Sequence, residues 1–245
     1  MRALLFFILA ILAEVLGTIG GFGSSVFFVP IAGFFFDFQS VLGLTALFHL
    51  GSNLSKVAQF RNGINLRLVL YLGIPSVILV ILGAQASDRF SGVTLQWILG
   101  IFLVLFSAFF IAFRRMEIKP TPARAIIGGG ISGFLAGILG TGGAIRGLTM
   151  AAFNLPKDIF IATSALIDLA VDLSRTAVYY DMGYIHAHDL IYVPFLIAIG
   201  WFGTRLGKTI LSQVPQERFR LISLMLVLLI GLVTLIYSFS EFSSK

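Results

Sequence analysis

The chain has 245 residues, of which 58% are hydrophobic and 11% are charged, and its mean hydropathy is +1.01. A soluble domain carries about 25% charged residues, so this composition indicates an integral membrane protein and excludes a soluble enzyme domain. Cysteine is absent, which excludes disulfides, thiol catalysis and cysteine-ligated metals. Lys and Arg on cytoplasmic loops explain the net charge of +6 better than nucleic-acid binding does.

The apolar segments occur as one series that is repeated in the second half of the chain. In the first half, residues 1–113, we expect a hairpin over 3–36 and helices over 39–60, 68–86 and 93–113. A basic linker with two prolines follows at 114–124. In the second half, residues 125–245, we expect a hairpin over 125–153 and helices over 157–180, 190–206 and 221–239. Such a repeat is typical of transporters. The first apolar residues would also suit a signal peptide, but their counterpart in the second half favours a structural element.

A glycine-rich segment interrupts the first apolar stretch of each half. The two segments are Gly17-Thr-Ile-Gly-Gly-Phe-Gly-Ser-Ser25 and Gly137-Ile-Leu-Gly-Thr-Gly-Gly-Ala-Ile-Arg146. Residues 3–36 would extend over ~51 Å as one helix, whereas the hydrocarbon core is ~30 Å thick. Two arms of 11 to 15 residues are each too short to cross. A re-entrant hairpin that enters and leaves on one side therefore fits better.

The positions of the cations test this topology. If the amino terminus lies outside, twelve Lys and Arg residues lie inside and three lie outside. Eight full crossings would instead move four of the twelve outside, namely Arg205, Lys208, Arg218 and Arg220. The positive-inside rule therefore favours an all-α polytopic protein of the cytoplasmic (inner) membrane with two inverted repeats. Each repeat would consist of a re-entrant helical hairpin and three transmembrane helices.

Charged and polar residues recur at matching positions on the first polar helix of each half. Inside a bilayer each charge costs ~2.5–3.5 kcal/mol on insertion scales. One set is His49, Asn53 and Lys56, and its counterpart is Asp168, Asp172 and Arg175. Both sets have the spacing i, i+4, i+7, which places the members of each set on one helix face. We expect both faces to line the interior, although Asp172 and Arg175 would also suit a structural ion pair.

The glycine segments predict an anion site where the two hairpin tips meet. The helix that follows each break begins with free N–H groups that suit an oxyanion, and Arg146 adds a charged fork. The predicted substrate-binding residues are Gly20, Gly21, Gly23, Ser24, Ser25, His49, Asn53, Thr141, Gly142, Gly143, Arg146, Asp172 and Arg175. The alternative, that the glycines only allow close helix packing, stays open.

Three buried residues are candidates for proton coupling: Glu14, His49 and Asp168. A histidine changes charge near neutral pH, and a buried carboxylate can accept a proton. An alternative for Glu14 is a cap or an ion pair with Arg146. We expect no cofactor, because no nucleotide-binding motif is present.

No metal is expected either. The loop Tyr184-Ile-His186-Ala-His188-Asp189 contains metal-ligating residue types, but at an unspecific spacing.

The motifs resemble those of a known family. Gly20-Gly-Phe-Gly-Ser24, Val29-Pro30 and a polar helix with Thr45 look like the first half of the TauE/SafE family of sulfite and sulfonate exporters. Gly140-Thr-Gly-Gly143 and Ala162-Thr-Ser164 echo them in the second half, so the resemblance covers essentially the whole chain. It implies export of sulfite, a sulfonate or another small organic anion.

Two features depart from the family pattern, and one is the set Asp168, Asp172 and Arg175, which is more charged than expected. Family members often carry a proline shortly after the second glycine run, whereas Arg146 stands in that helix here and the nearest proline is Pro156.

The sequence therefore predicts a secondary active transporter for a small anion, coupled to protons, with the lipid bilayer as its other partner. A passive anion channel on the same scaffold is the alternative. An intramembrane enzyme is disfavoured, because Asp168 and Asp172 lie four apart on one helix rather than on facing helices. The oligomeric state is left open, a homodimer included.

Overall fold

The computed structural model describes residues 2–20, 23–60, 63–113, 119–153, 155–213 and 216–243. Within these ranges the chain forms helices joined by short connections and contains no strand, which confirms the all-α prediction. The elements are α1 (Arg2–Gly20), α2 (Ser25–Ala32), α3 (Phe38–Gln59), α4 (Leu66–Leu68), η1 (Val69–Gly73), α5 (Ile74–Ser87), α6 (Gly92–Ala112), α7 (Pro122–Leu139), α8 (Gly143–Ala151), α9 (Lys157–Asp181), η2 (Asp189–Tyr192), α10 (Val193–Leu211) and α11 (Gln216–Ser243).

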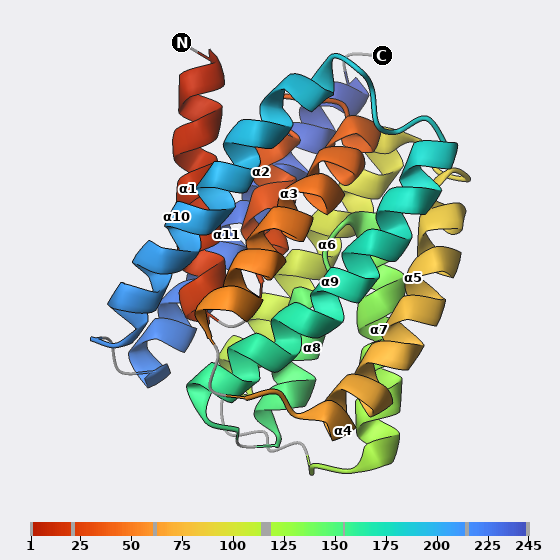
Figure 1. The fold of residues 1–245 in the computed structure, drawn as a ribbon. Coiled ribbons are helices and arrows are strands. Elements are labelled where there is room, and N and C mark those ends of the chain that lie inside the picture. Colours follow the sequence, from red (N-terminus) through yellow and green to blue (C-terminus); the bar gives the residue numbers. More distant parts are fainter. Residues whose placement is uncertain are drawn as a thin grey trace.

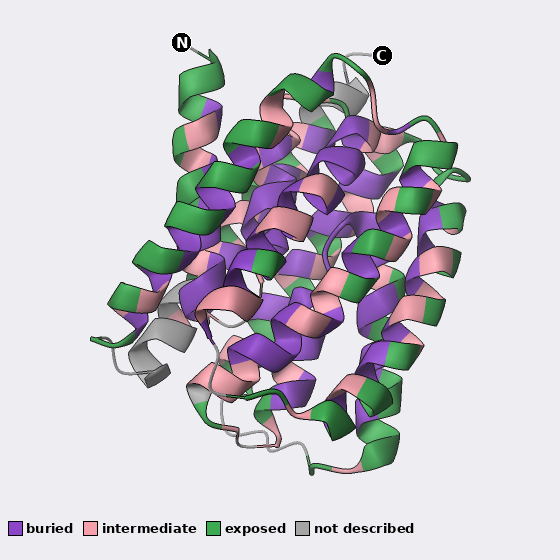
Figure 2. Ribbon diagram, in the orientation of Figure 1, coloured by how far each residue is buried: buried purple, intermediate pink, exposed green. Residues whose placement is uncertain are grey.

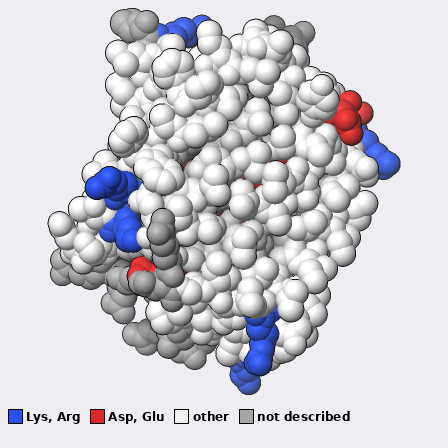
Figure 3. All heavy atoms as spheres, in the orientation of Figure 1, with Lys and Arg blue, Asp and Glu red and all other residues white. Residues whose placement is uncertain are grey.

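Among the described residues, five segments are long and apolar enough to cross a bilayer. They are α1, the continuous run Leu66–Ser87, α6, α7 and the run Asp189–Leu211. α11 contains a shorter apolar stretch, Leu224–Phe239. Many large apolar side chains on these helices are exposed, and Figure 3 shows a broad uncharged surface with the charged side chains toward its edges. Helices that face lipid require such a surface, so the structure is that of a multi-pass membrane protein.

The two long polar helices, α3 and α9, pack side by side in the middle of the bundle (Figure 1). α10 packs on α3 and on α1, α5 packs on α7 and on α9, and α6 packs on α11. The two termini lie at the same end of the bundle (Figure 1). Burial is concentrated on the sides of the helices that face the centre (Figure 2), where the rings of Phe28 in α2 and Phe48 in α3 lie 4.6 Å apart. The polar face of α3 is therefore enclosed on several sides.

A stripe of glycines joins α7 closely to η1 and α5. A Cβ atom would lie 2.2 Å from the Leu72 carbonyl oxygen if added at Gly129, 2.1 Å from that of Ser76 if added at Gly133, and 2.2 Å from that of Val80 if added at Gly137. Residues without side chains let the backbones of membrane helices approach this closely. For these three glycines, the packing interpretation is the one that the contacts support.

The helix before each glycine break is longer than expected, because α1 continues to Gly20 and α7 begins already at Pro122. α1 has 19 residues and α7 has 18, which gives each a length of ~27–29 Å. The prediction that both arms of each hairpin are too short to cross is therefore wrong for α1 and α7, whereas α2 and α8 have only 8 and 9 residues. Helical geometry continues through Gly17. The Ser24 backbone, just before α2, packs so closely on this residue that a Cβ there would lie 2.3 Å away. Packing of α2 on α1 thus offsets the weak helix propensity of glycine.

Candidate functional site

The two glycine breaks lie next to each other, although they are far apart in sequence. Thr141 Oγ1 donates a hydrogen bond to Ser25 Oγ at 3.3 Å. A Cβ on Gly23 would lie 3.8 Å from Arg146 Nη2 and 3.8 Å from Gly143 Cα. Gly21 lies outside the described residues, and Gly20 is the last residue of α1.

Among the described residues, each break contains a glycine with left-handed backbone geometry. The φ angles are 79° at Gly23 and 74° at Gly140. Only glycine adopts this region without strain, so these two positions define where each chain segment turns away from its first helix. A Cβ on Gly140 would also lie 2.9 Å from Leu42 Cδ2 of α3. The turns therefore bring both breaks against the central helix.

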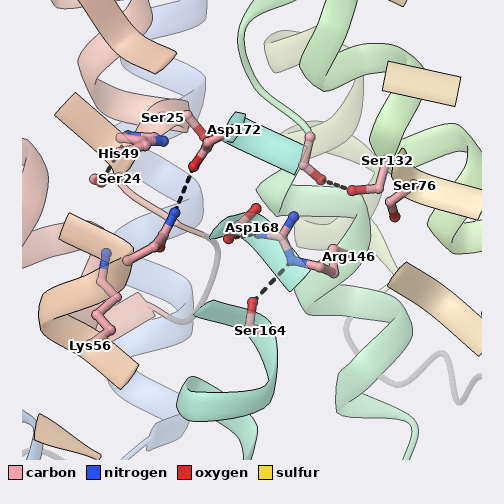
Figure 4. A network of polar contacts seen from close by, with 12 residues as sticks. Ser24, Ser25, His49, Lys56, Ser76, Ser132, Arg146, Ser164, Asp168 and Asp172 are labelled. Atoms are coloured by element: carbon pink, nitrogen blue, oxygen red, sulfur yellow. Dashed lines mark hydrogen bonds and ion pairs between the residues drawn. The ribbon is translucent and has the colours of Figure 1, made fainter. Parts of the chain in front are cut away.

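α3 contributes three buried polar side chains to this region, each with a different partner. His49 Nε2 lies 3.1 Å from Ser24 Oγ, at the start of α2. Asn53 Nδ2 donates to Asp172 Oδ2 of α9 at 2.7 Å. Lys56, one turn further along, is directed to α1. The face predicted for α3 thus lies inside the bundle, and Figure 4 shows His49 and Lys56 on the side of the cluster opposite Arg146.

Glu14 of α1 is fully buried and pairs with Lys56, its carboxylate oxygen Oε1 lying 2.7 Å from Lys56 Nζ. The same oxygen accepts hydrogen bonds from Ser52 at 2.7 Å, Thr204 at 2.9 Å and Thr18 at 3.2 Å. The other oxygen, Oε2, is buried and has no hydrogen-bond partner among the described residues. Glu14 Oε1 therefore joins α1, α3 and α10, whereas Oε2 makes no hydrogen bond to a described residue.

Arg146 lies one turn into α8 and is 2% exposed. Its Nε donates to Ser164 Oγ at 3.0 Å, and its Nη2 pairs with the Asp168 carboxylate. The predicted alternative of an ion pair between Glu14 and Arg146 is wrong, because Glu14 faces Lys56 instead. Ser164 was absent from the predicted site. Its position four residues before Asp168, on the same helix face, was the signal that could have found it.

Asp172 and Arg175 form the i, i+3 pair that the sequence allows. Arg175 Nε donates to Asp172 Oδ1 at 2.8 Å. Arg175 Nη1 also donates to the carbonyl oxygens of Ala136 at 3.1 Å and Gly140 at 3.0 Å. The last carbonyls of a helix have no partner within it, so Arg175 satisfies the end of α7. The contacts of Arg175 in this structure are therefore structural.

The buried charges of the cluster balance. The three ion pairs are Glu14 with Lys56, Arg146 with Asp168, and Arg175 with Asp172. Removing such charges from water is costly unless each has a partner and further hydrogen bonds. With His49 uncharged, the cluster has no net charge. An anion that entered it alone would leave one or more negative charges uncompensated.

A small cavity lies at the centre of the cluster. It measures about 20 Å³ and is lined by Gly23, Asn53, Lys56, Ser164 and Asp168, among others. This is room for about one water molecule. A larger cavity of about 980 Å³ lies between the segment after α2 and the start of α6, and none of the predicted site residues lines it. The cavity therefore has no room for a ligand larger than water unless the helices around it move.

Comparison with known proteins agrees with the motifs. The family model described as Sulfite exporter TauE/SafE matches residues 6–234, nearly the whole chain. No curated protein matches the chain. This is a family of membrane transporters, which fits the five apolar helices. The chain belongs to the sulfite exporter TauE/SafE family.

Proposed function

We propose that this protein is a secondary active transporter that exports a small oxyanion, such as sulfite or a sulfonate, across the cytoplasmic membrane. The observation that carries the proposal is Arg146, buried at the meeting point of the two glycine breaks. Its guanidinium can bind a sulfonate or sulfite with two hydrogen bonds. The N-terminus of α8 and the hydroxyl of Ser164 lie beside it and supply further donors.

We propose that the breaks are the tips of re-entrant hairpins in two inverted repeats. In support, the rings of Phe6, near the start of α1, and Phe36, after α2, lie 5.1 Å apart. A Cβ on Gly128, in α7, would lie 2.2 Å from Thr149 Oγ1, near the end of α8. Each short helix therefore returns along the helix before it. α1 begins at the end of the bundle that holds both termini, and α7 begins at the opposite end (Figure 1).

The charge balance of the cluster supports coupling to protons. A neutral cluster accepts an anion at low cost only if positive charge enters with it. Protonation of Asp168 would release Arg146 for the anion, and Glu14 or His49 could carry a proton at the other side of the cavity. Asp168 is the best placed of the three, because its partner is Arg146 itself.

The small size of the cavity in the cluster, about 20 Å³, supports a transporter over a passive anion channel. A channel requires a continuous pore in its open state, whereas alternating access requires a closed site. Purified protein in vesicles distinguishes them. A proton-coupled transporter concentrates sulfite against its gradient when a pH gradient is imposed, and a channel only equilibrates it.

The anion site itself is tested by Arg146→Ala. We expect sulfite affinity to fall by about 10–100-fold, the loss of ~1.5–3 kcal/mol from charge-assisted hydrogen bonds, as measured by calorimetry in detergent. Arg205→Ala, an exposed arginine on α10, is the matched control and should bind as the parent does. The double variant Arg146→Gln/Asp168→Asn removes both charges, so a loss of binding there cannot come from an unpaired carboxylate. Unchanged binding in the Arg146 variants would refute the site.

A further inference from the structure

The connection between α9 and α10 lies at the end of the bundle that holds both termini, away from the anion site (Figure 1). The connection is well fixed. The Tyr184 amide donates to the Tyr179 carbonyl oxygen at 2.9 Å, and the two rings stack at 5.6 Å. It also lies directly on α3, because a Cβ on Gly43 would lie 2.6 Å from the Tyr184 carbonyl oxygen. Side chains that follow Tyr184 are therefore held in place.

Three side chains of this connection bring atoms that can ligate a metal close together. His186 Nδ1 lies 3.4 Å from Asp189 Oδ2, and His188 Nε2 lies 3.2 Å from Asp189 Oδ1. One ligand atom from each of the three residues lies within 4.8 Å of the others. In a tetrahedral zinc site with bonds of about 2.0–2.2 Å, neighbouring ligand atoms are ~3.3–3.5 Å apart. Each of the two distances to Asp189 is close to that spacing, and they join different oxygens of its carboxylate.

The burial of these residues is uneven in a way that suits a cation. The side chain of Asp189 is 3% exposed, and neither of its oxygens has a hydrogen-bond partner among the described residues. A buried carboxylate without a hydrogen bond is costly. The histidine side chains are 42% and 77% exposed, so solvent reaches the cluster from one side. That side provides both an entry path and a position for a water ligand.

We propose that His186, His188 and Asp189 bind a divalent transition metal of the zinc type, with water completing the coordination. Two imidazoles and one carboxylate are ligands that zinc commonly takes, with an open fourth position. Ser40 Oγ of α3 lies 3.0 Å from His186 Nδ1 and orients that ring. Metal binding to His186 Nδ1 would replace the hydrogen bond between that nitrogen and the Ser40 hydroxyl. The metal would cross-link side chains within the α9–α10 connection itself.

Calorimetric titration of the full-length protein with zinc chloride tests the proposal. The protein is stripped with chelator, and any polyhistidine tag is removed because a tag binds zinc itself. We expect saturable binding of one zinc ion per chain and none of magnesium, a hard cation that prefers oxygen ligands. Lack of saturable zinc binding would overturn the proposal.

Variants assign the ligands. His188→Ala should weaken zinc binding by more than ~10-fold, since even the outer partners of metal ligands contribute ~10–100-fold. This side chain is the most exposed of the three, so its removal leaves the fold intact. Asp189→Asn should weaken binding as well. Asp181→Asn, an exposed acid near the same connection, is the matched control and should bind as the parent does. Equal binding by all three variants would show that zinc binds elsewhere and overturn the assignment.

Discussion

Asn53 Nδ2 of α3 donates a hydrogen bond of 2.7 Å to Asp172 Oδ2 of α9. The two residues occupy corresponding positions on the polar helices of the two halves, and they are in direct contact at the centre of the bundle. The bond therefore joins two elements that the sequence relates only by their pattern. Its partner atoms are both buried, so its loss has a measurable cost.

Replacing Asn53 by Ala should lower the free energy of unfolding by about 1–3 kcal/mol, because one oxygen of a buried carboxylate loses its partner. Thermal unfolding in detergent measures the effect. The control is Leu54→Ala, which changes the next residue along the chain, an exposed, lipid-facing side chain. Little change in stability is expected there. Equal stability of the two variants would contradict a structural role for the bond.

Replacing Gly133 by Ala should destabilise the protein by about 1–3 kcal/mol or more through overpacking. A Cβ there would lie 2.1 Å from the Ser76 carbonyl oxygen, so α5 and α7 must separate. The comparison is Gly130→Ala, whose Cβ would lie 3.0 Å from Leu79 Cδ1, the end of a flexible side chain. Thermal unfolding should rank Gly133→Ala well below Gly130→Ala, and the reverse order would contradict the packing described for these helices.

Replacing Glu14 by Gln should lower stability by about 3–5 kcal/mol, because Lys56 is left as an unpaired buried charge. Replacing Lys56 by Met in the same protein removes that charge. The double variant should therefore recover most of the loss, and a double-mutant cycle on thermal unfolding measures the coupling. Additive effects of the two changes would show that the ion pair is not coupled in the folded protein.

Replacing Asp168 by Asn should raise the affinity for sulfite and make it less dependent on pH. The amide resembles a protonated carboxyl group and no longer holds Arg146 by charge, so Arg146 is available to the anion at every pH. Calorimetry between pH 5 and 8 measures the change, with methanesulfonate beside sulfite because sulfite itself changes charge in this range and a sulfonate does not. The parent should bind more weakly as the pH rises and the carboxyl loses its proton. A parallel pH profile in the parent and the variant would exclude Asp168 as the coupling group.

The sequence predicted the general character of the fold better than the contacts of its buried polar residues. Composition alone indicated a helical membrane protein, and the glycine motifs pointed to the family that the full-length match confirms. The length of α1 was misjudged, because glycine propensity says little where α2 packs directly on Gly17. The inverted arrangement of the repeats stays a prediction.

The partners within the site depended on how each helix is rotated about its axis, which sequence spacing does not determine. Glu14 was expected near Arg146, but α1 presents it to Lys56. The donation from Arg175 to the carbonyls of Ala136 and Gly140 was also unforeseen, because it depends on where α7 ends. Ser164, by contrast, was missed although its position on the helix face that contains Asp168 could have predicted its place in the site.

Each of the three buried ion pairs lies within one half of the chain: Glu14 with Lys56 in the first, and Arg146 with Asp168 and Arg175 with Asp172 in the second. Hydrogen bonds from Asn53 and Thr141 cross between the halves at the site. If the halves rock against each other, every charge therefore keeps its counter-ion throughout the stroke. At the site, such a motion breaks hydrogen bonds and does not separate opposite charges in a medium of low dielectric constant.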